Sequence, residues 1–403
     1  MNTMSFSQAA TVLNSIVSQA TGQSNLTAIT TPGDFAAVAQ TALQTGLDPI
    51  LNTVSQIWSR TIFSERAWEN PLRSLYWSLP RYGNAVRKLS PVAGVMVDDD
   101  SYKWPVAFDA GQTPPSGNGQ SVDHFTIRKQ DVLQTNFYGT AVYEQQYTIF
   151  KDQFEACFES ADEFARFMAM NLTERNNDKQ SYEEGIARGL QANFIAGIID
   201  ENATGRVIHL LTEYNAATGI TPPLTATTVM QPGNFEGFIR WMYARIKTIV
   251  RMMGERSNLF QTNITGKTIL RHTTPDNMRI ALWTPFMEMI ESMVLSQTFR
   301  DEYMKLPIWE GINYWQAIGT PDSISMTPVY TGTNGAIATA SAVAQGDIVG
   351  FIHDRDALGY AITNPVSAVT PLNAKGLYWN EFYHARFKTI SDNTEKAVVL
   401  LLD

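Results

Sequence analysis

Residues 151–200 read KDQFEACFESADEFARFMAMNLTERNNDKQSYEEGIARGLQANFIAGIID. Ten acidic and five basic residues of this stretch alternate with apolar ones, and no proline occurs between Pro115 and Pro222. The apolar side chains recur at the i, i+3, i+4 and i+7 spacing of an amphipathic helix: Phe154, Cys157, Phe158, Ala161, Phe164, Ala165, Met168 and Leu172. The pattern predicts one helix several tens of ångströms long, which Gly185 and Gly189 bend or end.

The residues before this helix have the composition of a long β-hairpin. Between its arms, residues 109–120 (DAGQTPPSGNGQ) are turn formers that include Pro114 and Pro115. Two predicted strands precede this tip and two follow it: Val92–Val97, Tyr102–Phe108, Val122–Ile127 and Val132–Ile149. Hairpin arms of this length need a surface to lie on.

Helices and strands both follow the long helix, which predicts the α+β class. A helix is expected over Phe235–Met253 and another within Pro275–Met304, whereas residues 331–345 are rich in Gly, Ala, Thr and Ser and predict a surface loop. Four β-patterned stretches then close the chain: 348–352, 360–362, 377–388 and 396–402.

The first 59 residues contain only two charged side chains, Asp34 and Asp48. Val12, Ile16 and Ala20 fall at helical spacing, and a second apolar set begins at Phe35 after a candidate cap at Asp34. Two interpretations stay open. Either two or three amphipathic helices pack on the same chain, or the segment is an extended arm on neighbouring subunits, where water is excluded and low charge is tolerated.

Residues 60–90 are basic, with six Lys or Arg against Glu65 and Glu69. Trp68, Tyr76, Trp77 and Tyr82 are interleaved with them, a mixture that also occurs where proteins bind nucleic acid. We favour arginines that bridge to an acidic surface within an assembly, since the guanidinium fork pairs bidentately with carboxylates. The candidate bridging residues are Arg66, Arg73 and Arg81, and the candidate partners on the long helix are Glu155, Glu159 and Glu163.

The whole chain has 403 residues, of which 44% are hydrophobic and only 17% charged, with a net charge of −9. That hydrophobic content is ample for a buried core, and the negative charge is unlike that of a protein that holds nucleic acid by counterion release. Cys157 is the one cysteine, so a disulfide within the chain and a cysteine-based zinc site are excluded. No signal peptide and no membrane-spanning run is recognisable, which predicts a protein of the cytoplasm or of whatever particle it assembles into.

Motifs that carry chemistry are missing from the sequence. None of the five histidines has metal-ligand spacing, and Gly266-Lys-Thr268 lacks the glycine that a phosphate loop needs at position 261, where Gln261 stands. Asp98–Asp100 lacks the rest of a calcium loop. The sequence therefore predicts no catalytic residue, no cofactor and no metal. A chain of low charge with a projecting hairpin and a polar arm suits a subunit that contacts its own copies.

In the order of its segments the chain resembles the major capsid proteins of tailed bacteriophages, which have the Hong Kong 97 fold, and it looks closest to those of small short-tailed phages. The segment from Trp104-Pro-Val-Ala to Val122-Asp-His-Phe looks like the extended loop of these proteins. The most suggestive strings lie near the C-terminus: Ile348-Val-Gly-Phe-Ile352, Asp354–Gly359, Pro371–Gly376, Asn380–His384 and Asp392–Asp403.

The resemblance implies a structural protein that assembles into pentamers and hexamers of an icosahedral virion, around packaged double-stranded DNA that it does not bind specifically. Scaffolding, portal and decoration proteins are the other implied partners, and no membrane is involved. The implied divisions are an N-terminal arm (1–60), a peripheral domain with a spine helix (61–94 and 137–204), an extended loop (95–136), most of an axial domain (205–344), returning peripheral strands (345–390) and a C-terminal strand (391–403).

This chain departs from some members of that family. Its arm is almost uncharged, which argues against a cleaved scaffolding segment, and for the loop residues Lys103 and Lys129 we expect noncovalent contacts rather than crosslinks. Two other functions are kept open. One is a cellular nanocompartment shell of the same fold, and the other is a cytoplasmic enzyme, such as a hydrolase that uses Asp98–Asp100.

Overall fold

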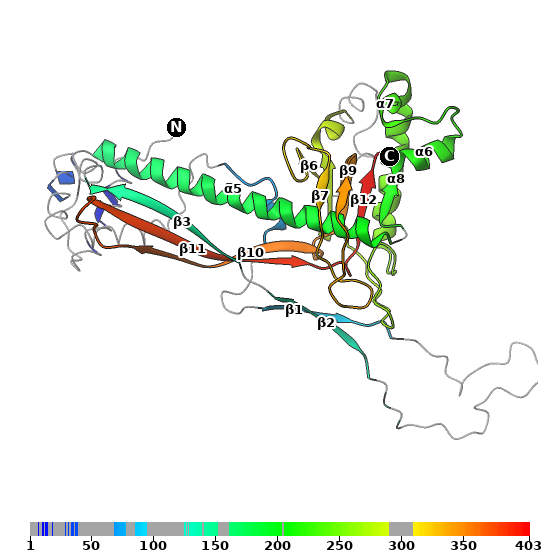
Figure 1. The fold of residues 1–403 in the computed structure, drawn as a ribbon, viewed down its shortest axis with the longest axis horizontal. Helices are drawn as coiled ribbons and strands as arrows, with labels where there is room; N and C mark the ends of the chain where they lie inside the picture. The colour runs from blue at the N-terminus through cyan, green and yellow to red at the C-terminus, as the bar shows by residue number, and fades with distance from the viewer. Residues whose placement is uncertain are drawn as a thin grey trace, which may run out of the picture.

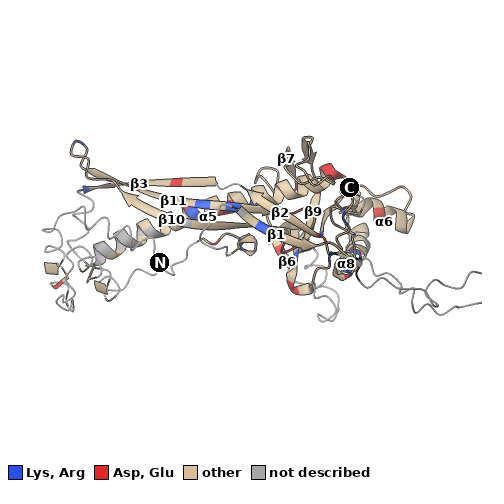
Figure 2. Ribbon diagram, turned by 90° about the horizontal axis from the view of Figure 1, so that it is seen from below, with Lys and Arg blue, Asp and Glu red and all other residues tan. Residues whose placement is uncertain are grey.

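The computed structural model describes most of the chain. The described residues are 68–77, 85–94, 129–138, 141–151, 161–203, 205–289 and 309–403, together with separate positions between 7 and 38 and at 125 and 127. Helices, two larger sheets and a projecting two-stranded ribbon are combined along one elongated axis (Figure 1). Charged residues are sparse along the drawn chain, most of which is tan in Figure 2.

The predicted long helix is α5 (Ala161–Glu201), which extends along a three-stranded antiparallel sheet (Figure 1). That sheet has the order β10-β11-β3, with β10 at Leu358–Val369, β11 at Tyr378–Ser391 and β3 at Ala141–Phe150. The alternating strand β3 presents Tyr147 to Asp178 of the helix, whose Oδ2 accepts the tyrosine hydroxyl at 2.8 Å. A buried ion pair of 2.7 Å between Arg175 and Glu381 joins the helix to β11.

The second sheet has five strands in the order β4-β12-β9-β5-β6. Its bounds are Val207–His209 for β4, Ala397–Leu401 for β12, Ile348–Asp354 for β9, Met278–Trp283 for β5 and Trp309–Ile312 for β6. Strands β9 and β12 are buried along their whole lengths, because helices cover both faces of this sheet.

The two faces of the five-stranded sheet belong to two apolar cores. Val398 and Leu400 pack in the core that contains α8 (Pro232–Gly254), whereas Val399 and Leu401 pack in the core that contains the C-terminal half of α5. This alternation follows from the two-residue period of a strand. Strand β12 therefore contributes to both cores, as do β9 and β5.

Shorter elements complete the described chain. They are η1 (Arg73–Leu75), α6 (Leu210–Thr218), α7 (Ala226–Val229), η2 (Pro275–Asn277), helical residues 284–289, and the antiparallel pair β7 (Ile324–Met326) and β8 (Val343–Gln345). Helix α8 begins with a proline in its first turn, where the missing N–H costs no hydrogen bond.

A separate two-stranded ribbon leaves the body of the molecule (Figure 1). It consists of β1 (Ala85–Pro91) and β2 (Val132–Tyr138), which pair antiparallel with Leu89 opposite Gln134. This confirms a hairpin, but its first paired strand lies before the predicted Val92–Val97. The β1 strand contains Arg87 and Lys88, which have low strand propensity, so the composition of the isolated segment concealed it.

Three further predictions are corrected. Val132–Ile149 is not one strand, because β2 pairs with β1 whereas β3 pairs with β11. Residues 331–345 are not all surface loop, because β8 pairs with β7 at Val343–Gln345 and Val343 is buried. Gly185 and Gly189 do not end α5, which continues to Glu201.

Of the predicted strand Val122–Ile127, only positions 125 and 127 are described, and neither lies in a strand. Other element predictions are confirmed: residues 284–289 are helical within Pro275–Met304. Helix α8 contains the predicted helix 235–253, and β9, β10, β11 and β12 contain the four predicted strands in whole or large part. Near the N-terminus, Thr31 is the cap rather than Asp34: the Thr31 N–H donates to Asp34 Oδ2 at 2.9 Å, and the Asp34 N–H donates to Thr31 Oγ1 at 3.3 Å. This reciprocal pair is a capping box with the carboxylate in the first turn.

Candidate assembly site at the base of the hairpin

The β1–β2 ribbon has two chemically different faces. Lys88 and Ser90 lie on the side that faces the body, and Ser90 is buried. Leu89 and Val132 lie on the opposite side and are 61% and 50% exposed. Phe125 and Ile127, before β2, are also largely exposed. Arg87, Gln134 and Asn136 share this face, so its exposed apolar side chains, Leu89 and Val132, are gathered at the end nearest the loop. Exposed apolar side chains gathered in one place are typical of a surface that another protein covers.

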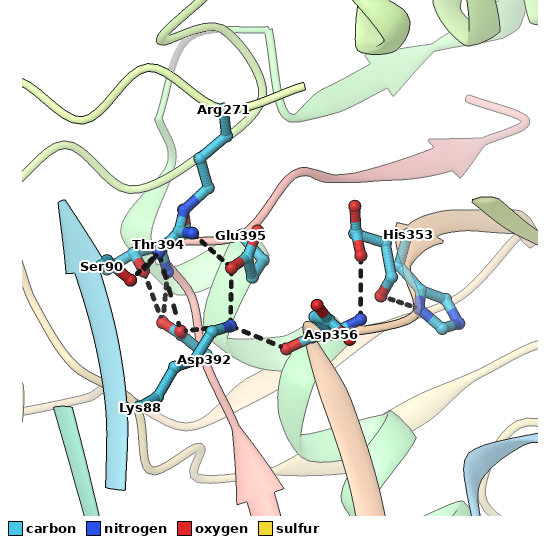
Figure 3. A network of polar contacts seen from close by, with 9 residues as sticks. Lys88, Ser90, Arg271, His353, Asp356, Asp392, Thr394 and Glu395 are labelled. Atoms are coloured by element: carbon cyan, nitrogen blue, oxygen red, sulfur yellow. Dashed lines mark hydrogen bonds and ion pairs between the residues drawn. The ribbon is translucent and has the colours of Figure 1, made fainter. Parts of the chain in front are cut away.

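The inner face is attached to the body by a network of charged groups (Figure 3). The Lys88 ammonium lies 2.9 Å from Asp392 Oδ2 and 2.6 Å from Glu395 Oε1, and it donates to the Asp356 carbonyl at 3.0 Å. Asp392 and Glu395 lie in the turn between β11 and β12, and Asp356 lies in the turn between β9 and β10. One side chain of the ribbon therefore connects to two turns of the body.

Arg271 completes this network from a third segment. Its guanidinium lies 2.5 Å from Glu395 Oε1 and donates to the Thr394 carbonyl at 2.7 Å and to Ser90 Oγ at 3.0 Å. Asp392 Oδ1 in turn accepts from the Thr394 amide at 3.0 Å and from its hydroxyl at 2.6 Å. We call Lys88, Arg271, Asp392 and Glu395, two cations with two carboxylates, the base network.

The base network is shielded from water. The side chains of Asp392 and Glu395 are 2% and 7% exposed. Burial alone would raise the pKa of Asp392, but Lys88, the Thr394 hydroxyl and Arg271 outweigh it and hold that pKa below its usual value. The carboxylate thus stays ionised, and the ribbon is held by charge-assisted hydrogen bonds, which are the stronger kind.

The candidate contact residues lie apart from this network. Arg73 is exposed on η1 and lies 3.8 Å from Glu69. Glu163 belongs to α5, but its side chain is outside the described residues. Also outside them are Arg66, Arg81, Glu155, Glu159, Pro114 and Pro115, as are Lys103 and the predicted tip 109–120. The predicted bridges between arginines and glutamates stay predictions.

The groups considered for chemistry have structural surroundings where they are described. His353 is buried, and its Nδ1 lies 2.8 Å from the Asp354 carbonyl. Residues 266–268 form a turn whose Thr268 carbonyl accepts the Ala93 amide at 2.8 Å, just beyond β1. Over the described ranges, no group of His, Cys, Asp and Glu side chains has the arrangement of a metal site. Asp98–Asp100 and Cys157 lie outside those ranges.

Sequence reasoning missed the base network. Its members come from positions 88, 271, 392 and 395, and only the fold brings them together. One signal was available: Asp392 and Glu395 lie between two strand-like stretches, 377–388 and 396–402. Charged residues in such a position are rarely buried unless they are paired. None of the helices among the described residues is both long and apolar enough to cross a membrane.

Comparisons with known proteins identify the family. Residues 13–400 match the model of the Phi29-like phage major capsid protein family. No curated protein matches. Among solved structures, a chain titled "Capsid structure of Staphylococcus phage Andhra" has a TM-score of 0.52 at 9% identity, covering 85% of this chain and 87% of that one. A chain from bacteriophage P68 has a TM-score of 0.46 at 8% identity, over 85% and 87%.

The predicted resemblance is thus confirmed for both fold and role. The likeness to the Andhra chain shows the α+β architecture of a phage capsid subunit, consistent with the Hong Kong 97 type, and the family match extends over nearly the whole sequence. The role is structural, in the capsid of the virion. The chain belongs to the Phi29-like phage major capsid protein family.

Proposed function

We propose that this chain builds a closed icosahedral shell of hexamers and pentamers, which encloses packaged double-stranded DNA without binding it specifically. The family match carries the proposal, and the projecting ribbon supports it. A closed shell repeats a small set of contacts between copies of one chain. A ribbon with exposed apolar side chains on its outer face, held firmly at its base, provides such a contact.

We assign the parts of the molecule to the divisions implied by the resemblance. The three-stranded sheet with α5 corresponds to the peripheral domain, and the β1–β2 ribbon forms the base of the extended loop. The predicted return segment 345–390 is divided, since β9 pairs with β5 and β12 in the five-stranded sheet. We therefore place β9 and β12 in the axial domain and begin the peripheral return at β10.

The contacts between subunits would use three surfaces. These are the outer face of the ribbon with the loop beyond it, the arm 1–60, and the basic segment around Arg73. The net charge of −9 suits a lumen that does not hold DNA tightly. Assembly in the host cytoplasm, with scaffolding and portal proteins and optional decoration proteins, completes the proposal.

Negative-stain microscopy of the purified full-length protein tests the proposal. We expect rings, sheets or shells with five- and six-fold clusters, from the protein alone or together with a scaffolding protein. Discrete monomers under all of these conditions would contradict it. Particles from infected cells separate the phage head from a nanocompartment, because the head contains nuclease-protected DNA of genome length.

A further inference from the structure

We propose that Lys88 and Arg271 are positioning residues that fix the angle at which the β1–β2 ribbon leaves the body, and that this angle selects one shell size. The inference rests on the proposed shell function and adds a determinant of its geometry. It starts from the base network, in which a lysine of the ribbon and an arginine of the body share the same pair of carboxylates.

The ribbon has little else to orient it among the described contacts. Its two strands form a sheet of their own and pair with neither of the larger sheets. Two-stranded hairpins are marginally stable alone. Just beyond β1, the Ala93 amide donates to the Thr268 carbonyl at 2.8 Å, but a single main-chain bond acts as a pivot and leaves rotation about it unrestrained.

The base network removes that rotation. Lys88 contacts the β9–β10 turn through Asp356 and the β11–β12 turn through Asp392, so two attachment points are fixed by one ammonium. The guanidinium of Arg271 adds a third point at Ser90, two residues along β1. The ribbon is thus bonded to three separate segments of the body, namely the β9–β10 turn, the β11–β12 turn and the segment that carries Arg271. Contacts with three segments restrict its rotation, and charge-assisted bonds in a buried site hold it stiffly.

Both turns that receive Lys88 are themselves rigid. The β11–β12 turn leads into β12, which is buried on both faces, and the Asp392 amide donates to the Ala357 carbonyl at 2.7 Å, which ties the two turns together. The base network therefore attaches the ribbon to turns that are joined to the buried centre of the molecule. A rotation of ~10° at the base would displace a point ~30 Å along an extended arm by ~5 Å. A displacement of that size in a contact between subunits would change the angle between neighbouring subunits.

The test uses the full-length protein with a pair of changes that avoids leaving a buried charge alone. Lys88→Met combined with Asp392→Asn removes one positive charge from the ribbon and one negative charge from the body. The asparagine Oδ1 can still accept hydrogen bonds from the amide and the hydroxyl of Thr394. The matched control is Lys375→Met, which removes an exposed cation from the turn between β10 and β11, outside both the ribbon and the base network. Lys88→Arg keeps the charge and serves as the rescue variant.

Two measurements are made on each variant. Hydrogen exchange of the unassembled subunit should show the β1 and β2 amides exchanging about tenfold faster in the Lys88→Met, Asp392→Asn protein, while β12 keeps its protection. Cryo-EM of assembled particles should show a broadened or shifted distribution of diameters for that protein. The control and the rescue variant should both give the wild-type diameter.

The outcomes separate this inference from the proposed function. Wild-type protein that forms no shells at all contradicts the function itself. Shells of wild-type diameter from the Lys88→Met, Asp392→Asn protein, with its ribbon exchanging faster, overturn the inference alone. Loss of β12 protection would mean that the double change disturbs the core; Arg271→Lys, which keeps one cation but loses the fork, is then decisive, and uniform wild-type shells from it overturn the inference.

Discussion

At the scale of single residues, His353 makes the folded subunit sensitive to acid. It lies in β9 with 2% of its surface exposed, and its ring stacks on Phe351 with 4.8 Å between centroids. Because the Asp354 carbonyl can only accept, His353 Nδ1 carries the proton of the neutral ring. Burial, with a smaller effect of Arg279, lowers the pKa of His353 to about 4.

The unfolded chain therefore binds a proton on this histidine before the folded chain does. The contribution of neutral His353 to the free energy of unfolding is present above pH ~6.5. It decreases as the pH drops toward 4, and about 2 kcal/mol of it is lost at pH 5. We expect urea unfolding of the wild-type subunit to show this loss between pH 7.5 and 5. Over the same interval, the free energy of unfolding of His353→Gln should fall by less, and the difference should be about the size of the His353 contribution. Equal losses in both proteins would show that His353 does not titrate in this way.

Gly359 is a second residue with a measurable role. A Cβ atom on it would lie 2.5 Å from Trp77 Nε1, and Trp77 cannot retreat freely because its amide donates to the Tyr360 carbonyl at 2.8 Å. We expect Gly359→Ala to lower the free energy of unfolding by about 1–3 kcal/mol through overpacking. Gly346→Ala is the control, since nothing lies within 4 Å of its added Cβ. Equal urea midpoints for the two variants would contradict the clash.

Residue-level features differ in how far the sequence reveals them. Low charge and aromatic content, which are visible in composition alone, directed attention toward assembly, and the family match bears out a structural role. The base network was not predictable, since Lys88 and Glu395 meet only after two sheets and two turns are in place. Exposed arginines such as Arg73 were conspicuous in the sequence, whereas the buried cation Arg271 was not.

At the scale of elements, the predictable ones are those whose own sequence carries the signal. The long helix has apolar residues at helical spacing, whereas β9 and β12 are short, mostly apolar runs typical of fully buried strands. The division between β2 and β3 was missed because both are β-rich and only their distant partners, β1 and β11, distinguish them. Pairing between remote strands leaves little trace in local composition.

The glycines of α5 give a prediction at this scale. Gly189 lies within the helix and has no atom within 4 Å of an added Cβ, so alanine there adds helix propensity without a clash. We expect Gly189→Ala to raise the stability of the subunit by about 0.5–1 kcal/mol. Gly197→Ala in the same helix is the contrast, because its Cβ would lie 3.2 Å from Tyr330. A thermal midpoint of Gly189→Ala at or below wild type would mean that the helix needs this glycine in another way.

At the scale of the whole molecule, the N-terminal segment can be separated from the body. The two described apolar cores contain no residue before Leu72, although Ala10, Leu13 and Phe35 are themselves buried. Both interpretations of residues 1–59, as helices on the same chain or as an arm on neighbours, therefore leave the body with a complete core. The rest of this segment lies mostly outside the described residues.

We expect the protein that lacks residues 1–59 to fold but not to assemble. Circular dichroism should show a cooperative thermal transition, since both cores are retained. Electron microscopy should show subunits or capsomers and no closed shells, because the nearly uncharged segment suits a surface that neighbours cover. Normal shells from the truncated protein would disprove the role of the arm.

The last prediction concerns the charge of the segment around Arg73 and the acidic surface of α5. Arg73 is an exposed arginine that lies 3.8 Å from Glu69, and the side chains of both are more than two-thirds exposed. Such a pair is worth at most ~1 kcal/mol within one chain. Bidentate bridges to a glutamate of a neighbouring copy would be repeated over every subunit of a shell. Arg73→Glu should therefore leave the thermal midpoint of the subunit nearly unchanged and should weaken the assembly of DNA-free shells.

A charge swap distinguishes the local pair from a bridge between subunits. Glu69→Arg combined with Arg73→Glu restores an ion pair one helical turn apart but moves the positive charge away from position 73. If Arg73 bridges subunits, light scattering should show the swapped protein assembling as poorly as Arg73→Glu, because the neighbour's carboxylate still meets a negative charge. Full recovery by the swap would confine the role of Arg73 to its own chain. Normal empty shells from Arg73→Glu, with failure only in DNA packaging, would instead place this arginine on the lumen beside phosphate.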